Sequence, residues 1–528
     1  MSKLRGAIIA FVLPISVAPA FASPPVNRID QGLVEGARAD GIATYRGIPY
    51  AAPPVGNLRW RPPQPSRSWD GVRPAREFAP ACMQTGVSMA GEAPPKISED
   101  CLYLNVWTQA RRRGVDAPVM VWLYGGGYTN GSAAMPLYWG DRLARRGVVV
   151  VSFGYRLGPL GYLAHPELSS ESGHGSSGNY GLMDQIAALQ WVKDNIEAFG
   201  GDPGNVTIFG QSAGAMSVSL LMASPRAAGL FHRAIGQSGG MFEPLQMAPH
   251  YLLAQAETDG VSFARSVGAA SLAELRRLPA EKLLQGRSGR VSHPVIEPHV
   301  LPLSPYDAYV AGRQNDVPII VGSNAEEANA LVDLRSVRAA TFADDLTRAW
   351  GPLPPQLGAA YPFSNDDEAR AARAAFERDL RFGWNMWAWA RLQAGASRKP
   401  AFYYRFAKRP PFPTDSPRKD WGASHFAELW YMFDHLDQEP WKWTEPDRRL
   451  ADRMSRYWVN FARSGNPNGP GLPDWPAFHQ PDGQMIILDD PIRLTTAPAD
   501  PQLAVFDAVY AAVRGSPLGV RPKPVAPR

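Results

Sequence analysis

Short hydrophobic runs recur along the chain and alternate with longer segments of helical pattern. The runs are rich in β-branched and aromatic residues, which is typical of buried strands. Four of them are 118–124, 206–209, 317–321 and 401–406. Segments such as 182–199, and the one that follows residue 212, have helical character. Strands alternating with helices build a mostly parallel sheet covered by helices, so we predict an α/β fold.

The length of the chain allows several domains, but its composition does not divide it. The 528 residues contain no Gly/Ser-rich linker, repeat or low-complexity block. We therefore predict one large domain over residues 23–528 with insertions. The stretch 339–393, rich in Ala, Arg and Trp, is expected to pack helices over the mouth of the functional site.

A Gly-x-Ser-x-Gly pattern at Gly210–Gly214 lies between a predicted strand and a predicted helix. This context is that of a nucleophile elbow, in which small neighbours let the backbone turn sharply and expose the hydroxyl of Ser212. The pattern occurs again around Ser238, but Gly240 and Pro244 argue against an immediate helix there. We predict that Ser212 is the nucleophile and that Ser238 ends a neighbouring strand, where it supports the site with a hydrogen bond.

Three consecutive glycines, Gly125–Gly127, follow the strand predicted at 118–124. Without side chains, their backbone N–H groups can point at a developing negative charge. Gly126 and Gly127, with the amide of Ala213 after the nucleophile, are the predicted oxyanion hole. A flexible turn is the alternative, whereas a nucleotide-binding loop would need another glycine spacing or a lysine.

An acid and a base should follow the nucleophile in chain order if the elbow belongs to an α/β-hydrolase. Glu326 and Glu327 come after the strand at 317–321, and spacing alone does not choose between them. Of the downstream histidines, His425 lies in a loop of small residues ahead of an apolar segment. A surface or structural role suits His435 and His479 better.

Several further blocks in fixed order carry a resemblance to a known family. They are Gly47-Ile48-Pro49-Tyr50-Ala51, 53–56, 58–60, 62–63, Ser98-Glu99-Asp100-Cys101-Leu102-Tyr103-Leu104-Asn105-Val106-Trp107, 179–185 and 199–203. With the elbow and the three glycines, the chain resembles the type-B carboxylesterases, the α/β-hydrolases that include the cholinesterases. By position in the family pattern, Glu327 matches the acid of the catalytic triad and His425 matches the base.

The resemblance implies a serine hydrolase that cleaves small-molecule carboxylic esters through an acyl-enzyme, without a metal or another cofactor. Three positions bear on the substrate. Gln211 stands where many relatives carry glutamate, and no tryptophan lies between Cys82 and Cys101, where cholinesterases place the indole that stacks on choline. Phe426 adds a ring where the family commonly has glycine. We expect neutral or aromatic esters rather than choline esters. Trp384, Trp387 and Trp389 could line a substrate pocket or pack in the core.

The N-terminus has the pattern of an export signal. Lys3 and Arg5 precede an apolar stretch, and Ala20-Phe21-Ala22 fits a cleavage site, so we predict removal of residues 1–22 and export. No other segment is long and apolar enough to span a bilayer. Loss of Lys3 and Arg5 lowers the formal charge from +5 to +3, and the basic run Arg111–Arg113 is better explained as a solvated loop than as a nucleic-acid site.

The chain has two cysteines, Cys82 and Cys101, in one local block. Their proximity in an exported chain favours a disulfide, and matching positions in the family are bridged. Closing this loop should contribute roughly 3 kcal/mol in the chain-entropy model. A zinc site would need another ligand spacing.

Two other functions remain open at this stage. Some proteins of this fold have lost the triad and act in adhesion, which the presence of Ser212, Glu327 and His425 disfavours. The same triad could also hydrolyse amides or thioesters.

Overall fold

The computed structural model describes residues 24–87, 89, 93–109, 116–286, 288–479, 483–498 and 500–521. The predicted export signal at 1–22 and the run Arg111–Arg113 lie outside these residues. Among the helices that are described, none combines the length and the apolar character that a membrane span requires.

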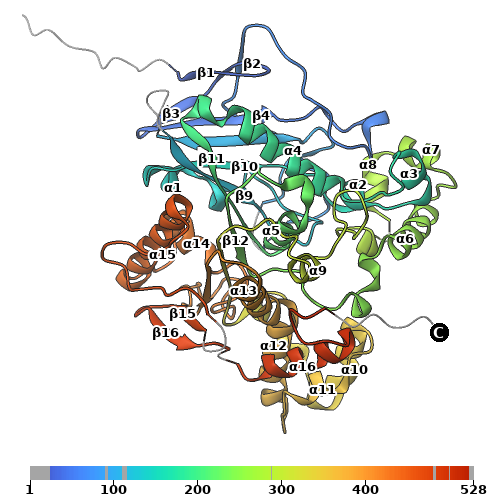
Figure 1. The fold of residues 1–528 in the computed structure, drawn as a ribbon, viewed down its shortest axis with the longest axis vertical. Helices are drawn as coiled ribbons and strands as arrows, with labels where there is room; N and C mark the ends of the chain where they lie inside the picture. The colour runs from blue at the N-terminus through green and yellow to red at the C-terminus, as the bar shows by residue number, and fades with distance from the viewer. Residues whose placement is uncertain are drawn as a thin grey trace, which may run out of the picture.

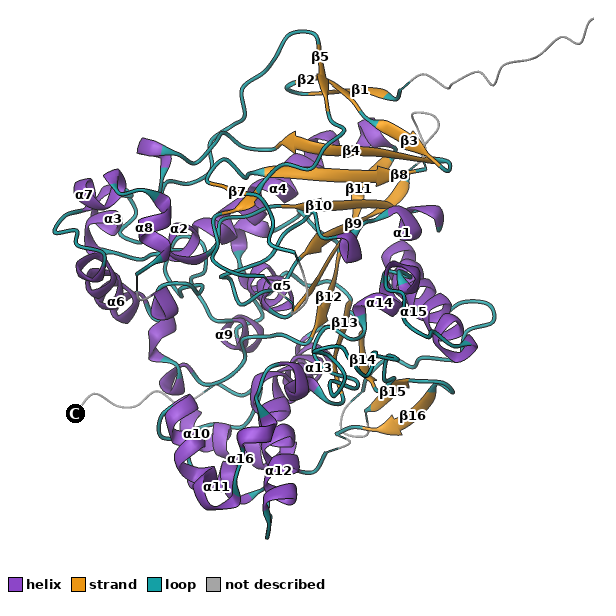
Figure 2. Ribbon diagram, turned by 180° about the vertical axis from the view of Figure 1, so that it is seen from behind, coloured by secondary structure: helices purple, strands orange, loops and turns teal. Residues whose placement is uncertain are grey.

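An eleven-stranded sheet runs through the centre of the molecule (Figures 1 and 2). Its order is β16-β15-β14-β13-β12-β11-β9-β10-β8-β4-β3. The seven strands from β15 to β10 are parallel, and antiparallel pairs flank them at both ends. The strands are β3 (Ala37–Ala39), β4 (Ile42–Pro49), β8 (Tyr103–Thr108), β9 (Ala117–Leu123), β10 (Val149–Phe153), β11 (Gly201–Gln211), β12 (Arg233–Gln237), β13 (Ile319–Asn324), β14 (Ala401–Phe406), β15 (Gln484–Leu488) and β16 (Arg493–Thr496).

The four predicted strands correspond to β9, β11, β13 and β14. Within the predicted runs every residue except Pro118, Val317 and Pro318 is buried, because helices cover both faces of the parallel part of the sheet. The short strand β12 lies between β11 and β13 and ends at Gln237, so Ser238 follows a strand next to that of Ser212. The carboxyl ends of β11, β12 and β13 thus bring their following residues to one edge of the sheet.

Helices pack on both faces of the sheet. The views agree that α1, α14 and α15 lie on one side and α5 and α9 on the other (Figures 1 and 2). The helices are α1 (Asp141–Arg145), α2 (Gly158–Tyr162), α3 (Pro166–Glu171), α4 (Tyr180–Asn195), α5 (Ala213–Ala223), α6 (Leu253–Ser266), α7 (Leu272–Arg277), α8 (Ala280–Leu284), α9 (Pro305–Val310), α10 (Phe342–Trp350), α11 (Pro355–Ala359), α12 (Asp366–Arg378), α13 (Trp384–Ala396), α14 (Leu429–Met432), α15 (Glu445–Ser464) and α16 (Gln502–Arg514).

The stretch predicted to insert helices, 339–393, forms α10, α11, α12 and most of α13. A π-helical turn, Asp379–Gly383, connects α12 to α13. Trp384 and Trp389 are fully buried, and the Trp389 indole donates to the hydroxyl of Tyr309 at 2.9 Å. These two tryptophans therefore pack in the core rather than at an open pocket.

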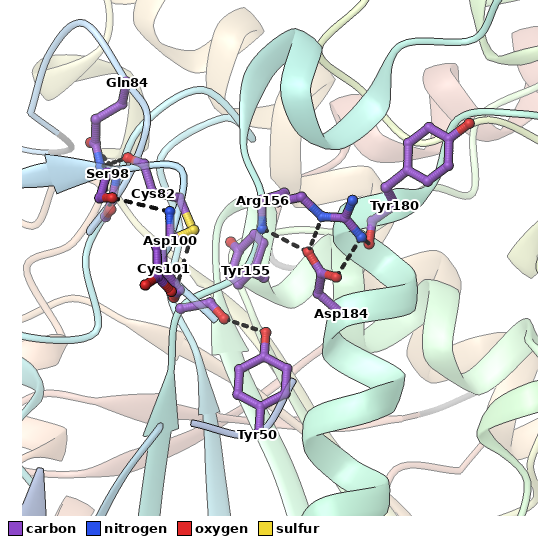
Figure 3. The surroundings of a disulfide bond; sticks show 12 residues. Tyr50, Cys82, Gln84, Ser98, Asp100, Cys101, Tyr155, Arg156, Tyr180 and Asp184 are labelled. Carbon is purple, nitrogen blue, oxygen red and sulfur yellow. Dashed lines mark hydrogen bonds and ion pairs between the residues drawn. A yellow bond between two sulfur atoms is a disulfide. The ribbon is translucent and has the colours of Figure 1, made fainter. Parts of the chain in front are cut away.

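A small two-stranded sheet, β6 (Ala81–Cys82) with β7 (Ile97–Ser98), carries the disulfide between Cys82 and Cys101, as the sequence predicts (Figure 3). Beside it, Gln84 makes two hydrogen bonds of 2.8 Å to the backbone of Gly131. These bonds attach the disulfide loop to the segment that follows the three glycines.

Candidate active site

Ser212 occupies a sharp turn between β11 and α5. Its backbone has φ 58° and ψ −126°, a region that costs a residue with a Cβ about 1–3 kcal/mol. The Ser212 amide donates to the carbonyl of Gln237 on the neighbouring strand at 2.9 Å, which helps to hold this turn. Ser212 is partly exposed while the residues on either side are buried. Its hydroxyl is therefore presented at the end of the sheet.

The glycines of this motif are required by close packing. A Cβ on Gly214 would lie 1.9 Å from the carbonyl oxygen of Leu123, and a Cβ on Gly210 would lie 2.5 Å from the backbone of Gly214. Both distances are far below van der Waals contact, so larger residues would push α5 away from β9. Glycine is thus required at positions 210 and 214 because the start of α5 packs so closely against the sheet.

Ser238, in the second copy of the pattern, has a different environment. It is completely buried, and its hydroxyl donates to Oε1 of Glu327 at 2.6 Å. Its amide donates to the carbonyl of Gly322, within β13. Burial removes this hydroxyl from any substrate, while its hydrogen bond orients an acidic side chain.

Glu327 and His425 are joined directly. Oε2 of Glu327 lies 2.6 Å from Nδ1 of His425, and both side chains are buried. Oε1 of the same carboxylate accepts from Ser238 and from the backbone amide of Asn324, at 2.6 Å each. With its two oxygens held in this way, Glu327 holds the imidazole at Nδ1, and Nε2 is not engaged by this carboxylate.

The neighbouring glutamate and the other histidines are placed elsewhere. Glu326 pairs with Arg409 and accepts from the amide of Ala423, so it supports the loop of His425 without touching the ring. His435 is buried and contacts the carbonyl of Leu137 and Asp141, a structural role, and His479 is exposed. The choice that spacing left open between the two glutamates is thus resolved by geometry, since only Glu327 reaches His425.

Gly126 and Gly127 follow β9 in a turn with positive φ angles of 118° and 61°. Within the part of the chain that the structure describes, neither amide donates a hydrogen bond, and the same holds for Ala213 at the start of α5. The turn packs directly on the nucleophile, because a Cβ on Gly125 would lie 2.8 Å from Cβ of Ser212. The backbone N–H groups of Gly126, Gly127 and Ala213, which have no acceptor among the described residues, therefore lie in the segments that flank Ser212.

Aromatic rings surround the imidazole of His425. Phe382, from the π-helical turn before α13, stacks on it with ring centroids 4.5 Å apart and planes 13° apart. Phe426 meets it edge-on at 4.5 Å and has φ 74°, a rare conformation for a bulky residue. Among the described residues, no hydrogen bond joins Ser212 to His425. Instead, Nε2 of Gln211 lies 3.1 Å from Nε2 of His425.

A second carboxyl group, that of Glu428, is buried near Glu327. It accepts from Asn324 Nδ2 at 2.5 Å and from Gln237 Nε2 at 3.3 Å. Burial, with the negative charge of Glu327 nearby, raises the pKa of Glu428 to about 8. The side-chain amide of Asn324 donates to Glu428, and its backbone amide donates to Glu327. One residue therefore links the two carboxyl groups.

Comparison with known proteins identifies the family of the chain. The model of the carboxylesterase family matches residues 23–351 and 355–506. The chain belongs to the carboxylesterase family. It is 38% identical to a fumonisin B1 esterase of Sphingopyxis macrogoltabida over 88% of this chain and 87% of that protein. It is 33% identical to a para-nitrobenzyl esterase of Bacillus subtilis (strain 168) over 88% and 95% of the two chains.

Solved structures extend the likeness to three dimensions. A para-nitrobenzyl esterase structure superposes with a TM-score of 0.78 at 32% identity, covering 91% of this chain and 99% of the other. The protein is thus a carboxylesterase with the α/β-hydrolase fold, and its activity is hydrolysis of carboxylic esters.

Two contributors to this carboxylesterase site were not predicted from sequence. Phe382 lies in a distant insertion, and nothing in its local pattern indicates contact with His425. Glu428 had a usable signal, since a glutamate three residues after the base in an otherwise apolar stretch is expected to be buried. A buried acid so close to the base requires partners, and the structure supplies them in Asn324 and Gln237.

Proposed function

We propose that Ser212, His425 and Glu327 form the catalytic triad of this carboxylesterase. The contact between Glu327 and His425 at 2.6 Å, beside a partly exposed serine in a strained turn, carries the proposal. Ser212 Oγ attacks the ester carbonyl while Nε2 of His425 takes its proton, and Glu327 stabilises the imidazolium. The hydrogen bond from Ser212 to His425 forms when a substrate occupies the site, since such bonds are often long in the empty enzyme.

The amides of Gly126, Gly127 and Ala213 then hold the negative charge of the tetrahedral intermediate. His425 gives its proton to the departing alcohol, which leaves the acyl group on Ser212. Water, deprotonated by the same imidazole, hydrolyses this acyl-enzyme and restores the serine. Two residues support the triad without contacting the substrate: Ser238 orients Glu327, and Gln211 contacts His425.

Neutral and aromatic esters are the proposed substrate class. Rings of Phe382 and Phe426 surround the base, and residue 211 is an uncharged amide, so no carboxylate directly before the nucleophile attracts a cation. The names of two relatives, a para-nitrobenzyl esterase and a phenmedipham hydrolase of Pseudarthrobacter oxydans at 33% identity, fit aromatic substrates.

Steady-state hydrolysis of p-nitrophenyl esters from acetate to octanoate, beside butyrylcholine, tests this function. Ser212→Ala should lower kcat by about 10⁵ to 10⁶, as loss of a triad nucleophile does. The acyl-chain length that the wild type hydrolyses fastest indicates the size of its acyl pocket. Near-normal turnover by Ser212→Ala would refute the triad, and faster hydrolysis of butyrylcholine than of every aryl ester would refute the substrate class.

We also propose that the enzyme is exported and that its mature chain, from residue 23, is a single domain. The N-terminal pattern and the disulfide between Cys82 and Cys101 support export. The intact mass of the purified exported protein should correspond to a chain that begins at Ser23. Retention of residues 1–22 in that protein would contradict the cleavage.

A further inference from the structure

A cavity of about 870 Å³ lies between the disulfide loop and the segment after the three glycines. Its walls include the rings of Phe78, Trp139 and Trp430, and Gln84 contributes an amide. A volume of this size accommodates a drug-sized molecule. None of the triad residues proposed above, and none of the proposed oxyanion-hole residues, lines it.

One loop separates this cavity from the catalytic serine. Gly125, at the start of the loop, packs against Ser212, and Gly131, at its other end, lines the cavity. A Cβ on Gly131 would lie 2.6 Å from the carbonyl oxygen of Gly125, so the two ends of the loop are in contact. Gln84 fixes Gly131 from the cavity side with two hydrogen bonds. The cavity and the ester site are therefore neighbours on opposite sides of the same turn.

The charges around the cavity favour a neutral occupant. The guanidinium of Arg46 lies 4.7 Å from the ring of Phe78 and 5.0 Å from that of Trp139, so these rings already hold a cation. The guanidinium of Arg418 lies 5.6 Å from the ring of Trp430 and pairs with Glu439 at 3.0 Å. A cationic ligand would be repelled by both arginines and by Lys96, which also lines the cavity. An anionic ligand would have to compete with Glu439 for Arg418 and would meet Lys96 at an exposed position.

The polar atoms of the inner wall are also engaged. The Gln84 amide bonds to the backbone of Gly131 and Cys82, and the Trp139 indole donates to the carbonyl of Ala134. With these groups satisfied, burial of apolar surface and contact with rings supply the binding energy. Lys96 and Gln438 are exposed at the cavity and mark the side open to solvent.

We propose that this cavity is a second small-molecule site, separate from the ester site, which binds a neutral ligand that bears aromatic rings. The loop between Gly125 and Gly131 connects the two sites, so the ligand contacts the segment that carries the oxyanion-hole glycines. The assignment rests on the cavity itself and is independent of the roles proposed for Ser212, His425 and Glu327.

Fluorescence of N-phenyl-1-naphthylamine, a neutral probe with three aromatic rings, tests the site on the full mature protein. Titrations are made with free enzyme and with enzyme treated with phenylmethanesulfonyl fluoride, whose adduct on Ser212 is verified by mass spectrometry. We expect one saturable site with the same Kd in both forms. Absence of the adduct would bear on the catalytic proposal alone, because the titration of free enzyme still measures the cavity.

Two substitutions test whether the probe binds in this cavity. Ala134→Trp fills the cavity from its wall, and Ala93→Trp fills it from an exposed position where folding is not at risk. Each should raise the probe Kd at least about tenfold, which is 1.4 kcal/mol. Ala508→Trp, on an exposed position of α16, is the matched control and should leave the Kd unchanged. No saturable binding, loss of binding in the Ser212 adduct, or an unchanged Kd in both cavity variants would overturn the proposal.

Discussion

The side-chain amide of Gln211 lies over the imidazole of His425. Its Nε2 is 3.1 Å from Nε2 and 3.3 Å from Nδ1 of the ring. A position at these distances from both nitrogens is above the ring, since the in-plane position would overlap the carbon between them. An N–H group at this place interacts favourably with a neutral imidazole and unfavourably with an imidazolium.

Gln211→Glu should therefore shift the pH dependence of catalysis. A carboxylate beside the ring attracts the imidazolium and so favours it over the neutral ring. Because the base acts only when neutral, the acidic limb of kcat/KM against pH should move to higher pH. Hydrolysis of p-nitrophenyl butyrate from pH 5 to 9 measures this limb.

The control for this change is Gln190→Glu, which makes the same substitution at an exposed position of α4. It alters the net charge equally but leaves His425 untouched, so its acidic limb should coincide with that of the wild type. An acidic limb that stays in place, or moves to lower pH, in Gln211→Glu would contradict the role assigned to the amide.

Ser238→Ala tests the second Gly-x-Ser-x-Gly motif. The variant removes one of the two hydrogen bonds that Glu327 Oε1 accepts, and the amide of Asn324 retains the other. Losing a hydrogen bond to a charged group is worth about 1.5–3 kcal/mol, so kcat/KM should fall by roughly 10- to 100-fold, far less than in Ser212→Ala. Both variants are compared with p-nitrophenyl butyrate. A loss as large as that of Ser212→Ala would mean that Ser238 itself reacts.

The parallel strands could be predicted from sequence for a physical reason. Runs such as 401–406 are buried on both faces, so their composition alone marks their limits, and β14 spans Ala401–Phe406. The residues just after such strands meet at one edge, which is why Ser212, Ser238 and the pair Glu326 and Glu327 could be predicted to lie near one another. The family pattern then chose Glu327 and, together with chain order, His425.

The surroundings of the base could not be predicted in this way. Phe382 reaches His425 because a π-helical turn redirects the chain between α12 and α13, and hydrophobic periodicity does not report such a turn. The aromatic cavity likewise depends on how the disulfide loop packs against Gly131 through Gln84. Both features arise from contacts between segments far apart in the chain.

At position 426 we expect a glycine variant to be more stable than an alanine variant, the reverse of the usual order. The φ of Phe426, 74°, lies where a residue with a Cβ is strained by roughly 1–2 kcal/mol and glycine is not. Phe426→Ala and Phe426→Gly lose the same buried ring, so their difference isolates the backbone. We expect the glycine variant to be the more stable by about 1 kcal/mol, measured from urea unfolding.

The matched pair for that comparison is Phe263→Ala and Phe263→Gly, inside the peripheral helix α6. There the alanine variant should be the more stable by about 1 kcal/mol, because glycine weakens a helix. The same order at both positions would show that Phe426 is unstrained. Removal of the Phe426 ring also opens the space beside His425, so both Phe426 variants should hydrolyse bulky esters faster relative to p-nitrophenyl acetate.

Glu428 should make the stability of the enzyme depend on pH. Its pKa is about 8 in the folded protein and near its ordinary value of 4.5 in the unfolded chain. Between these values the folded state binds one more proton than the unfolded state, so stability falls as pH rises, by up to about 1.4 kcal/mol per pH unit from this group. Glutamine at this position cannot ionise. Relative to the wild type, Glu428→Gln should therefore gain stability steadily from pH 5 to pH 8, as measured by urea unfolding at each pH.

Gln237→Met separates this effect from the loss of a hydrogen bond. The variant removes the Gln237 amide that donates to Glu428 but keeps the ionisable carboxyl group. It is expected to be less stable at every pH and still to lose stability as pH rises. Glu428→Gln differs from it because the pH-dependent loss itself disappears. Parallel curves for Glu428→Gln and the wild type would show that Glu428 is already ionised in the folded enzyme, held as a second buried negative charge beside Glu327.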